Sequence, residues 1–216
     1  DLLLFTDTTR DAVKSLEKKK YVVIEQKQVE RNPFLHKVEK KTSKLKFTDE
    51  QQYAYDKISF AMDKNKYGEY LIYGVTGSGK TEIYLQLIEN ALRNNKTSIM
   101  LVPEISLTPQ TVDRFIARFG EENIAVLHSK LSIGERFDQW NKIKNGQAKI
   151  VIGARSAIFA PIKDLGIIII DEEHDSSYKS ESTPRYNAKD IARYLCKENN
   201  IPLVLGSCLL YTSDAA

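Results

Sequence analysis

Gly74-Val75-Thr76-Gly77-Ser78-Gly79-Lys80-Thr81 fits the G-x-x-x-x-G-K-S/T phosphate-loop pattern at every fixed position. Residues 70–73 form an apolar run that predicts a short buried strand, and the apolar residues after Thr81 recur at helical spacing. The loop therefore lies between a strand and a helix N-terminus, where backbone N–H groups and the helix dipole attract phosphate. The alternative is a chance Gly/Ser turn before a helix, but the agreement of both flanks with the motif favours a nucleotide site.

Each part of this motif has an expected role in binding ATP. Lys80 is placed to reach the β- and γ-phosphates, and the hydroxyl of Thr81 can ligate Mg²⁺. We therefore expect ATP and Mg²⁺ as cofactors. The residues expected to bind the nucleotide are Gly74, Val75, Thr76, Gly77, Ser78, Gly79, Lys80 and Thr81.

An acidic box, Asp171-Glu172-Glu173-His174, directly follows the apolar run 167–170. A buried strand that ends in acids places the first carboxylate at the carboxyl edge of a parallel sheet, where ligands of open α/β folds bind. Asp171 is then suited to hold Mg²⁺ through water, and Glu172 to polarise the attacking water. An acidic turn without function is the alternative, and the upstream phosphate loop makes it the weaker one.

Composition places the chain among ordinary globular proteins. It has 216 residues, 42% of them hydrophobic, and no apolar run approaches the length of a membrane span. The N-terminus lacks the basic start and the length of a signal peptide. Cys196 and Cys208 have neither C-x-x-C spacing nor a nearby histidine, so neither a disulfide framework nor a zinc site is expected. We expect a soluble, cytoplasmic protein with no membrane partner.

Charge is unevenly distributed along the chain. The formal net charge is +3, yet residues 10–46 hold 12 Lys/Arg against 5 Asp/Glu, a net +7 that leaves −4 for the remainder. A solvated surface or linker explains such a segment, and attraction to nucleic-acid phosphates is the sharper alternative. Charge alone leaves both open.

Apolar runs alternate with helical patterns from residue 48 to residue 205. Besides 70–73, strands are predicted at 98–102, 124–127, 149–152, 166–170 and 202–205. Continuous apolar strands between helices indicate a parallel sheet covered on both faces, an α/β nucleotide-binding fold. Before it, residues 8–29 suggest a helix and a β-like hairpin, and residues 31–46 are irregular and basic.

The first helix of this fold begins with a capping box, Thr48-Asp49-Glu50-Gln51. Gln51 has two interpretations. As structure it closes the cap, and as function it hydrogen-bonds an adenine, because Phe47-Thr48-x-x-Gln51 resembles the adenine-reading element of helicases. The second interpretation rests on the resemblance alone.

The order and spacing of several further segments resemble the PriA family of bacterial superfamily 2 helicases (primosomal protein N′). The similarity covers roughly residues 10–207. A GTPase would instead need an Asn-Lys-x-Asp guanine reader, which residues 141–144 fail at the last position. Besides the phosphate loop, the segments are Pro103-Glu104 with Thr108-Pro109-Gln110, Gly153-Ala154-Arg155-Ser156-Ala157, Asp171-Glu172-Glu173-His174-Asp175, Ser177-Tyr178-Lys179 and Arg185-Tyr186.

This resemblance implies a RecA-like motor lobe of an ATP-dependent 3′→5′ DNA helicase that acts in replication restart at stalled forks. The implied partners are fork and single-stranded DNA, the primosome and single-strand-binding proteins. His174 is implied to couple the nucleotide state to the DNA, and is grouped with Glu172, Lys80 and Asp171 as catalytic. The residues implied to contact DNA are Pro103, Glu104, Thr108, Gln110, Arg155, Ser156, Tyr178, Lys179, Arg185 and Tyr186.

The resemblance also implies a domain organisation. Residues 1–35 match the C-terminal part of a winged-helix domain, 36–46 a basic linker, and 47–207 the first motor lobe. Residues 208–216 are expected to be a non-native tail, because the family continues with Ala-Thr-Pro after Gly206-Ser207. We expect the second motor lobe, its arginine finger and the zinc module of the family to be absent, so this fragment should hold no zinc and be inactive alone.

Two other functions stay open from the sequence. The chain could be the motor of another superfamily 2 DNA translocase, such as a restriction enzyme, although the contexts of Arg155 and Tyr178 favour the PriA family. It could also be a non-catalytic ATP-binding or partner-docking module, which a hydrolysis measurement with and without a second lobe would distinguish.

Overall fold

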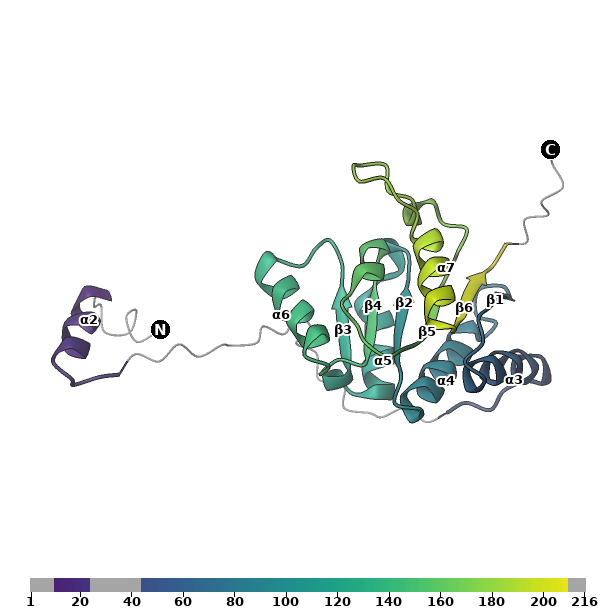
Figure 1. Ribbon diagram of the computed structural model, residues 1–216, viewed down its shortest axis with the longest axis horizontal. Helices are drawn as coiled ribbons and strands as arrows, with labels where there is room; N and C mark the ends of the chain where they lie inside the picture. Colours follow the sequence, from purple (N-terminus) through teal and green to yellow (C-terminus); the bar gives the residue numbers. More distant parts are fainter. Residues whose placement is uncertain (1–9, 24–43, 210–216) are drawn as a thin grey trace. The chain divides into compact units, whose positions relative to one another are not determined.

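Six parallel strands form the sheet at the centre of the described structure, in the order β1-β6-β5-β2-β4-β3 (Figure 1). The computed structural model describes residues 10–23 and 44–209. Every residue of the last five strands is buried, as their continuous Ile, Leu and Val runs predict. The strands are β1 (Gly68–Tyr73), β2 (Thr97–Leu101), β3 (Ile124–Leu127), β4 (Ile150–Gly153), β5 (Leu165–Ile170) and β6 (Pro202–Ser207).

Helices cover the sheet and enclose two apolar clusters. One cluster joins the sheet to α3 (Asp49–Asp63), α4 (Lys80–Arg93) and α5 (Pro109–Phe119). The other includes residues of α6 (Ile133–Lys144), α7 (Ala188–Asn199) and the 3-10 helix η3 (Arg155–Phe159). The predicted α/β parallel-sheet fold is therefore confirmed. Three further 3-10 turns are η1 (Glu104–Ser106), η2 (Glu121–Asn123) and η4 (Ser176–Tyr178).

Local sequence signals start most of these helices where expected. The capping box at Thr48 and Gln51 is present, and a second one joins Ser132 to Glu135. Ile133, Phe137 and Trp140 recur in the sequence at helical spacing and lie on α6, but their side chains are 91%, 60% and 37% exposed. The apolar spacing therefore predicts this helix correctly without marking its buried side.

The chain divides into two compact units, residues 1–30 and 31–216. In the first, the structure describes α2 (Arg10–Lys18) and residues 19–23, and the described part of the predicted β-like run, residues 21–23, is exposed and forms no strand. The other residues of the predicted winged-helix segment, the linker up to residue 43 and residues 210–216 of the predicted tail lie outside the described residues. No helix in the described parts of the chain is long and apolar enough to cross a membrane.

Candidate functional site

The register of three neighbouring strands brings the two predicted chemical centres together. Tyr73 of β1 pairs with Ser207 of β6, and Ile170 of β5 pairs with Leu205. The phosphate loop, the acidic box and the end of β6 therefore meet at the carboxyl edge of the sheet. Between the loop and the acidic box lies a cavity of about 600 Å³, lined by Leu45, Val75, Thr76, Gly77, Ser78, Gly79, Lys80, Thr81, Glu82, Leu85, Arg114, Arg118, Asp171 and Glu172.

The phosphate loop has the backbone conformation that its glycines permit. Gly77 and Gly79 have φ angles of 84° and 86°, in the left-handed region that strains other residues. No atom lies within 4 Å of a Cβ built at Gly77, so the loop encloses open space. Lys80 is buried, and its Nζ lies 2.5 Å from the carbonyl oxygen of Gly74 and 3.7 Å from Oε1 of Glu172. The loop thus has both the backbone conformation and the lysine cation that binding of a triphosphate requires.

Asp171 is held by two buried tyrosines from different elements. The hydroxyl of Tyr84, on α4, donates to its Oδ1 at 3.0 Å, and the hydroxyl of Tyr178 donates to its backbone oxygen at 2.6 Å. Burial raises the pKa of the Asp171 carboxyl, and the hydrogen bond from Tyr84 opposes that shift. A largely buried carboxylate beside Thr81 and an open phosphate cradle fits a Mg²⁺ ion, because a divalent cation offsets the cost of burying the charge.

Glu172 occupies a strained position, since its φ is 44°. One of its carboxylate oxygens, Oε1, faces Lys80, whereas Oε2 is buried without a hydrogen-bond partner and lies 3.7 Å from Nδ1 of His174. Nδ1 of His174 also lies 3.0 Å from the hydroxyl of Ser207. The nearby Glu172 carboxylate raises the pKa of the Cys208 thiol, which lies just beyond β6. The acidic box is thus packed against the end of β6.

Gln51 joins the cap of α3 to the phosphate loop. Its Oε1 accepts from the Thr48 N–H at 3.0 Å, and its Nε2 donates to the carbonyl oxygen of Ser78 at 2.8 Å. The capping interpretation is therefore confirmed. The adenine interpretation is not tested by these contacts and stays a prediction, in which the amide would exchange one of them for the base.

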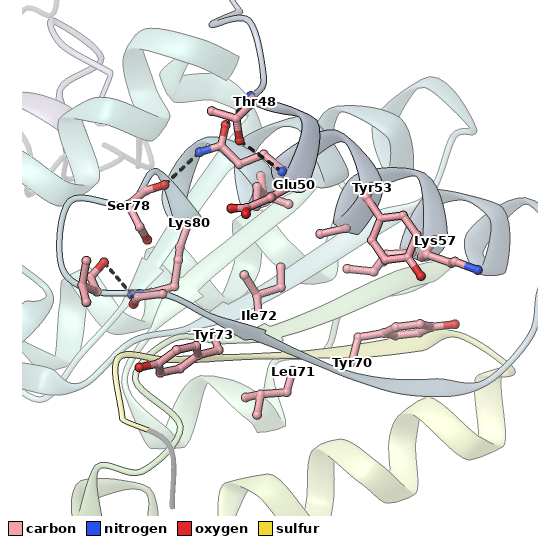
Figure 2. A pocket seen from close by; sticks show the side chains of 16 residues that line it. Thr48, Glu50, Tyr53, Lys57, Tyr70, Leu71, Ile72, Tyr73, Ser78 and Lys80 are labelled. Carbon is pink, nitrogen blue, oxygen red and sulfur yellow. Dashed lines mark hydrogen bonds between the residues drawn. The ribbon is translucent and has the colours of Figure 1, made fainter.

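Beside Gln51, a groove of about 760 Å³ runs between α3 and the edge strand β1 (Figure 2). Tyr53 and Lys57 reach toward it from the helix, and Tyr70 and Tyr73 lie on the strand (Figure 2). Lys80 lines both this groove and the cavity at the phosphate loop. Aromatic side chains next to a phosphate site offer a surface for a nucleoside.

The residues expected to contact DNA are only partly brought together. Glu104, Arg155 and Ser156 line a cavity of about 190 Å³ with Ser129 and Ser177. Hydrogen bonds from Ser129 to the Glu104 carboxylate lower the pKa of Glu104. The ionised carboxylate therefore holds the loop that contains Ser129.

Arg155 connects this cavity to the loop that precedes α7. This loop protrudes beside the helix (Figure 1). Its guanidinium donates to the carbonyl oxygens of Ser177 and Lys179 and lies 5.6 Å from the ring centroid of Tyr186. Tyr186 in turn packs edge-on against Phe159 at 5.0 Å. Thr108 caps α5, and Gln110, Lys179 and Arg185 are exposed.

Two of the residues expected to contact DNA are buried in this structure. Tyr178 is 1% exposed, and its hydroxyl is bonded to the backbone of Asp171, so it cannot stack on a base in this structure. The tyrosine packs instead in the apolar cluster that includes residues of the sheet. Pro103 is also buried, at the position that precedes η1.

Sequence reasoning missed three residues of the site. Helical spacing alone marks Tyr84 only as a residue of the helix, although its position three residues after Thr81 places it on the loop side of α4. Arg114 and Arg118 of α5 line the phosphate cavity, and Arg118 pairs with Glu82 at 3.2 Å. No motif in the sequence marked these arginines, because their place beside the loop depends on how α5 packs.

Comparison with known proteins identifies the family. The family model described as Type III restriction enzyme, res subunit, matches residues 44–206. The chain belongs to this family. It is also 51% identical over 202 residues to the replication restart protein PriA of Bacillus subtilis, an alignment that covers 94% of the chain and 25% of that protein.

PriA proteins of other bacteria show the same similarity. The chain is 49% identical to PriA of Chlamydia pneumoniae, over 73% of the chain and 21% of that protein, and 46% identical to PriA of Treponema pallidum, over 78% and 25%. The expected resemblance to the PriA family is therefore confirmed, and the chain spans about a quarter of the length of these relatives.

Solved structures confirm the fold. RecG bound to a three-way DNA junction matches with a TM-score of 0.59 and 24% identity, over 78% of this chain and 22% of that one. The Hef helicase domain of Pyrococcus furiosus matches with a TM-score of 0.53 and 24% identity, over 74% and 32%. The lobe is RecA-like and belongs to the helicase and NTPase class.

Proposed function

We propose that this chain is the ATP-binding lobe of an ATP-dependent 3′→5′ DNA helicase that acts in replication restart. The observation that carries the proposal is the single cavity at which the phosphate loop, Thr81, Asp171 and Glu172 meet. The similarity to PriA proteins supports the replication role, and a cytoplasmic location belongs to the same proposal.

The phosphate loop and the acidic box each have a role in this proposal. Lys80 would leave the Gly74 carbonyl and offset the charge of the β- and γ-phosphates, while the N–H groups of the loop hold their oxygens. Thr81 and Asp171 would hold Mg²⁺, which supplies charge neutralisation at the transferred phosphoryl group. Glu172 would orient the attacking water and accept its proton, and His174 would link this turn to β6 through Ser207.

The DNA would bind along the loops that follow β2, β4 and β5. Thr108, Gln110, Ser156, Lys179 and Arg185 offer hydroxyl, amide and cationic groups that hold phosphates without reading bases. Tyr186 is the remaining aromatic candidate for stacking, supported by Arg155. Fork DNA, the primosome and single-strand-binding proteins remain proposed partners.

A calorimetric titration of residues 1–216 with Mg·ATP tests nucleotide binding. We expect the Lys80→Ala variant to bind at least about tenfold more weakly, because it loses the cation at the phosphates while the glycines keep the shape of the loop. Lys66→Ala, at an exposed lysine after α3, is the matched control. Equal affinities of the parent and the Lys80→Ala variant would contradict the assignment.

A restriction-type DNA motor is the second candidate, because the matching family model is described by a restriction enzyme subunit. It uses the same cavity, so nucleotide binding does not separate the two. A non-catalytic docking module would bind ATP but gain no DNA-dependent hydrolysis when a second motor lobe is supplied.

A further inference from the structure

Three side chains with different donor atoms converge beside the acidic box. A carboxylate oxygen of Glu172, a ring nitrogen of His174 and the sulfur of Cys208 all lie within 4.8 Å of one another. Glu172 and His174 follow β5, and Cys208 follows β6, the neighbouring strand of the sheet. All three are half-buried, so the cluster is shielded from water yet reachable by an ion.

The geometry of the cluster suits a tetrahedral ion. Bonds of about 2.0–2.3 Å to zinc place neighbouring ligand atoms about 3.3–3.8 Å apart. Oε2 of Glu172 and Nδ1 of His174 are already 3.7 Å apart. Small side-chain rotations of Cys208 would bring its sulfur to the same separation.

One carboxylate oxygen of Glu172 has no hydrogen-bond partner in the described part of the chain. Lys80 faces Oε1, whereas Oε2 is buried without a hydrogen-bond partner. A buried oxygen of this kind is costly unless a donor or a cation satisfies it. Glu172 also has a φ of 44°, a backbone conformation that is strained for a residue with a side chain.

From this geometry we propose that Glu172, His174 and Cys208 form a zinc site. The donor set of one thiolate, one imidazole and one carboxylate matches Zn²⁺, whereas Mg²⁺ and Ca²⁺ prefer oxygen ligands alone. Three protein ligands leave the fourth position of a tetrahedral ion for water. Cys208 lies outside the family match, which ends at residue 206.

Zinc at this position would exclude Glu172 from activating water, which makes zinc an inhibitor of hydrolysis. That consequence rests on the proposed function, whereas zinc binding does not require ATP or DNA. Sequence spacing predicted no zinc site, because Cys208 has no histidine near it in the chain. The three residues lie close together only because β5 and β6 are neighbouring strands of the sheet.

Titration of reduced, chelator-treated residues 1–216 with Zn²⁺ against a chromophoric chelator tests the site, with Co²⁺ as a spectroscopic probe. We expect one Zn²⁺ per chain and a thiolate-to-cobalt absorption band. Cys208→Ser should abolish the band and weaken zinc binding at least about tenfold, and His174→Gln should weaken zinc binding while keeping the thiolate.

Two variants serve as matched controls. Cys196→Ala removes the other cysteine, which lies on α7 and is fully buried in the core, and His128→Gln removes a histidine after β3. Both should bind zinc as the parent does, and thermal melts confirm that each variant is folded. The proposal is overturned if the parent binds no equimolar zinc, or if Cys208→Ser binds within about twofold of the parent. Loss of ATP binding in the same preparations would count against the proposed function and leave the zinc site standing.

Discussion

Tyr84 joins the phosphate-loop helix to the acidic box through one hydroxyl. Its side chain is fully buried, and burial together with the neighbouring charge of Asp171 raises the pKa of the tyrosine far above its ordinary value, so it stays a donor. The sequence places it on the helix but does not reveal its partner, which lies 87 residues away. Gly77, Gly79, Lys80 and Thr81, by contrast, could be recognised because the loop chemistry is local.

Replacing Tyr84 by Phe should lower the free energy of unfolding by about 1–3 kcal/mol. The ring still fills the core, while Asp171 loses the hydrogen bond to its buried carboxylate. Urea denaturation measures the change, and Tyr194→Phe, at a tyrosine that is 63% exposed, should change stability by less than about 0.5 kcal/mol. Equal effects of the two variants would show that the hydroxyl of Tyr84 adds no stability.

Glu172→Gln should keep ATP binding and lose hydrolysis in a longer version of the protein that carries both motor lobes. An amide is close in size to the carboxylate but cannot accept the proton of the attacking water. Binding measured by calorimetry and turnover measured by phosphate release separate the two effects. Near-normal turnover would remove Glu172 from the catalytic role.

At the scale of elements, helices and strands could be predicted better than the faces they bury. The capping signals and apolar runs gave the elements, because both depend on neighbouring residues in the chain. The stripe of Ile133, Phe137 and Trp140 on α6 is exposed, since β3 is an edge strand and the helix buries Gln139 and Ile143 instead. The burial of Tyr178 could not be predicted for a related reason, since it depends on the tertiary position of η4.

Arg155 should hold the loop before α7 in place. Its guanidinium bonds to two carbonyl oxygens of that loop and lies over Tyr186, so Arg155→Ala removes three contacts at once. We expect faster hydrogen exchange at residues 179–186 and weaker binding of a single-stranded oligonucleotide at low salt. Arg136→Ala, at an exposed arginine on α6, is the control. Unchanged exchange would show that the loop is held by its other contacts.

At the scale of the whole molecule, the parallel sheet could be predicted but the order of its strands could not. Apolar runs between helices indicate parallel strands, whereas the order depends on where each crossover packs. That order puts β6 between β1 and β5 and thereby creates both the phosphate cavity and the Glu172, His174 and Cys208 cluster. The sequence therefore predicts the components of the site, but which of them lie side by side depends on the strand order.

Thiol reactivity tests the packing of the sheet against α7. Burial raises the pKa of Cys196 to about 12, so at pH 8 only about one molecule in ten thousand carries the thiolate there. A disulfide reagent should therefore label one thiol per native chain, that of Cys208, and two in denaturant. Rapid labelling of both thiols in the native protein would contradict the buried position of Cys196.

The central claim is that this chain is half of a motor. On the proposed function, the phosphate loop, Lys80, Thr81 and Asp171 would supply the ground-state contacts, and a second lobe would supply the further cation for the charge that develops on the transferred phosphoryl group. Such arginine fingers contribute on the order of 10³–10⁵ in rate in phosphate-loop enzymes. Steady-state phosphate release from purified residues 1–216, with single-stranded DNA titrated in, should show negligible turnover that DNA barely stimulates. DNA-stimulated turnover of about one per second that Lys80→Ala abolishes would contradict the claim, because the lobe would then complete its own catalytic site.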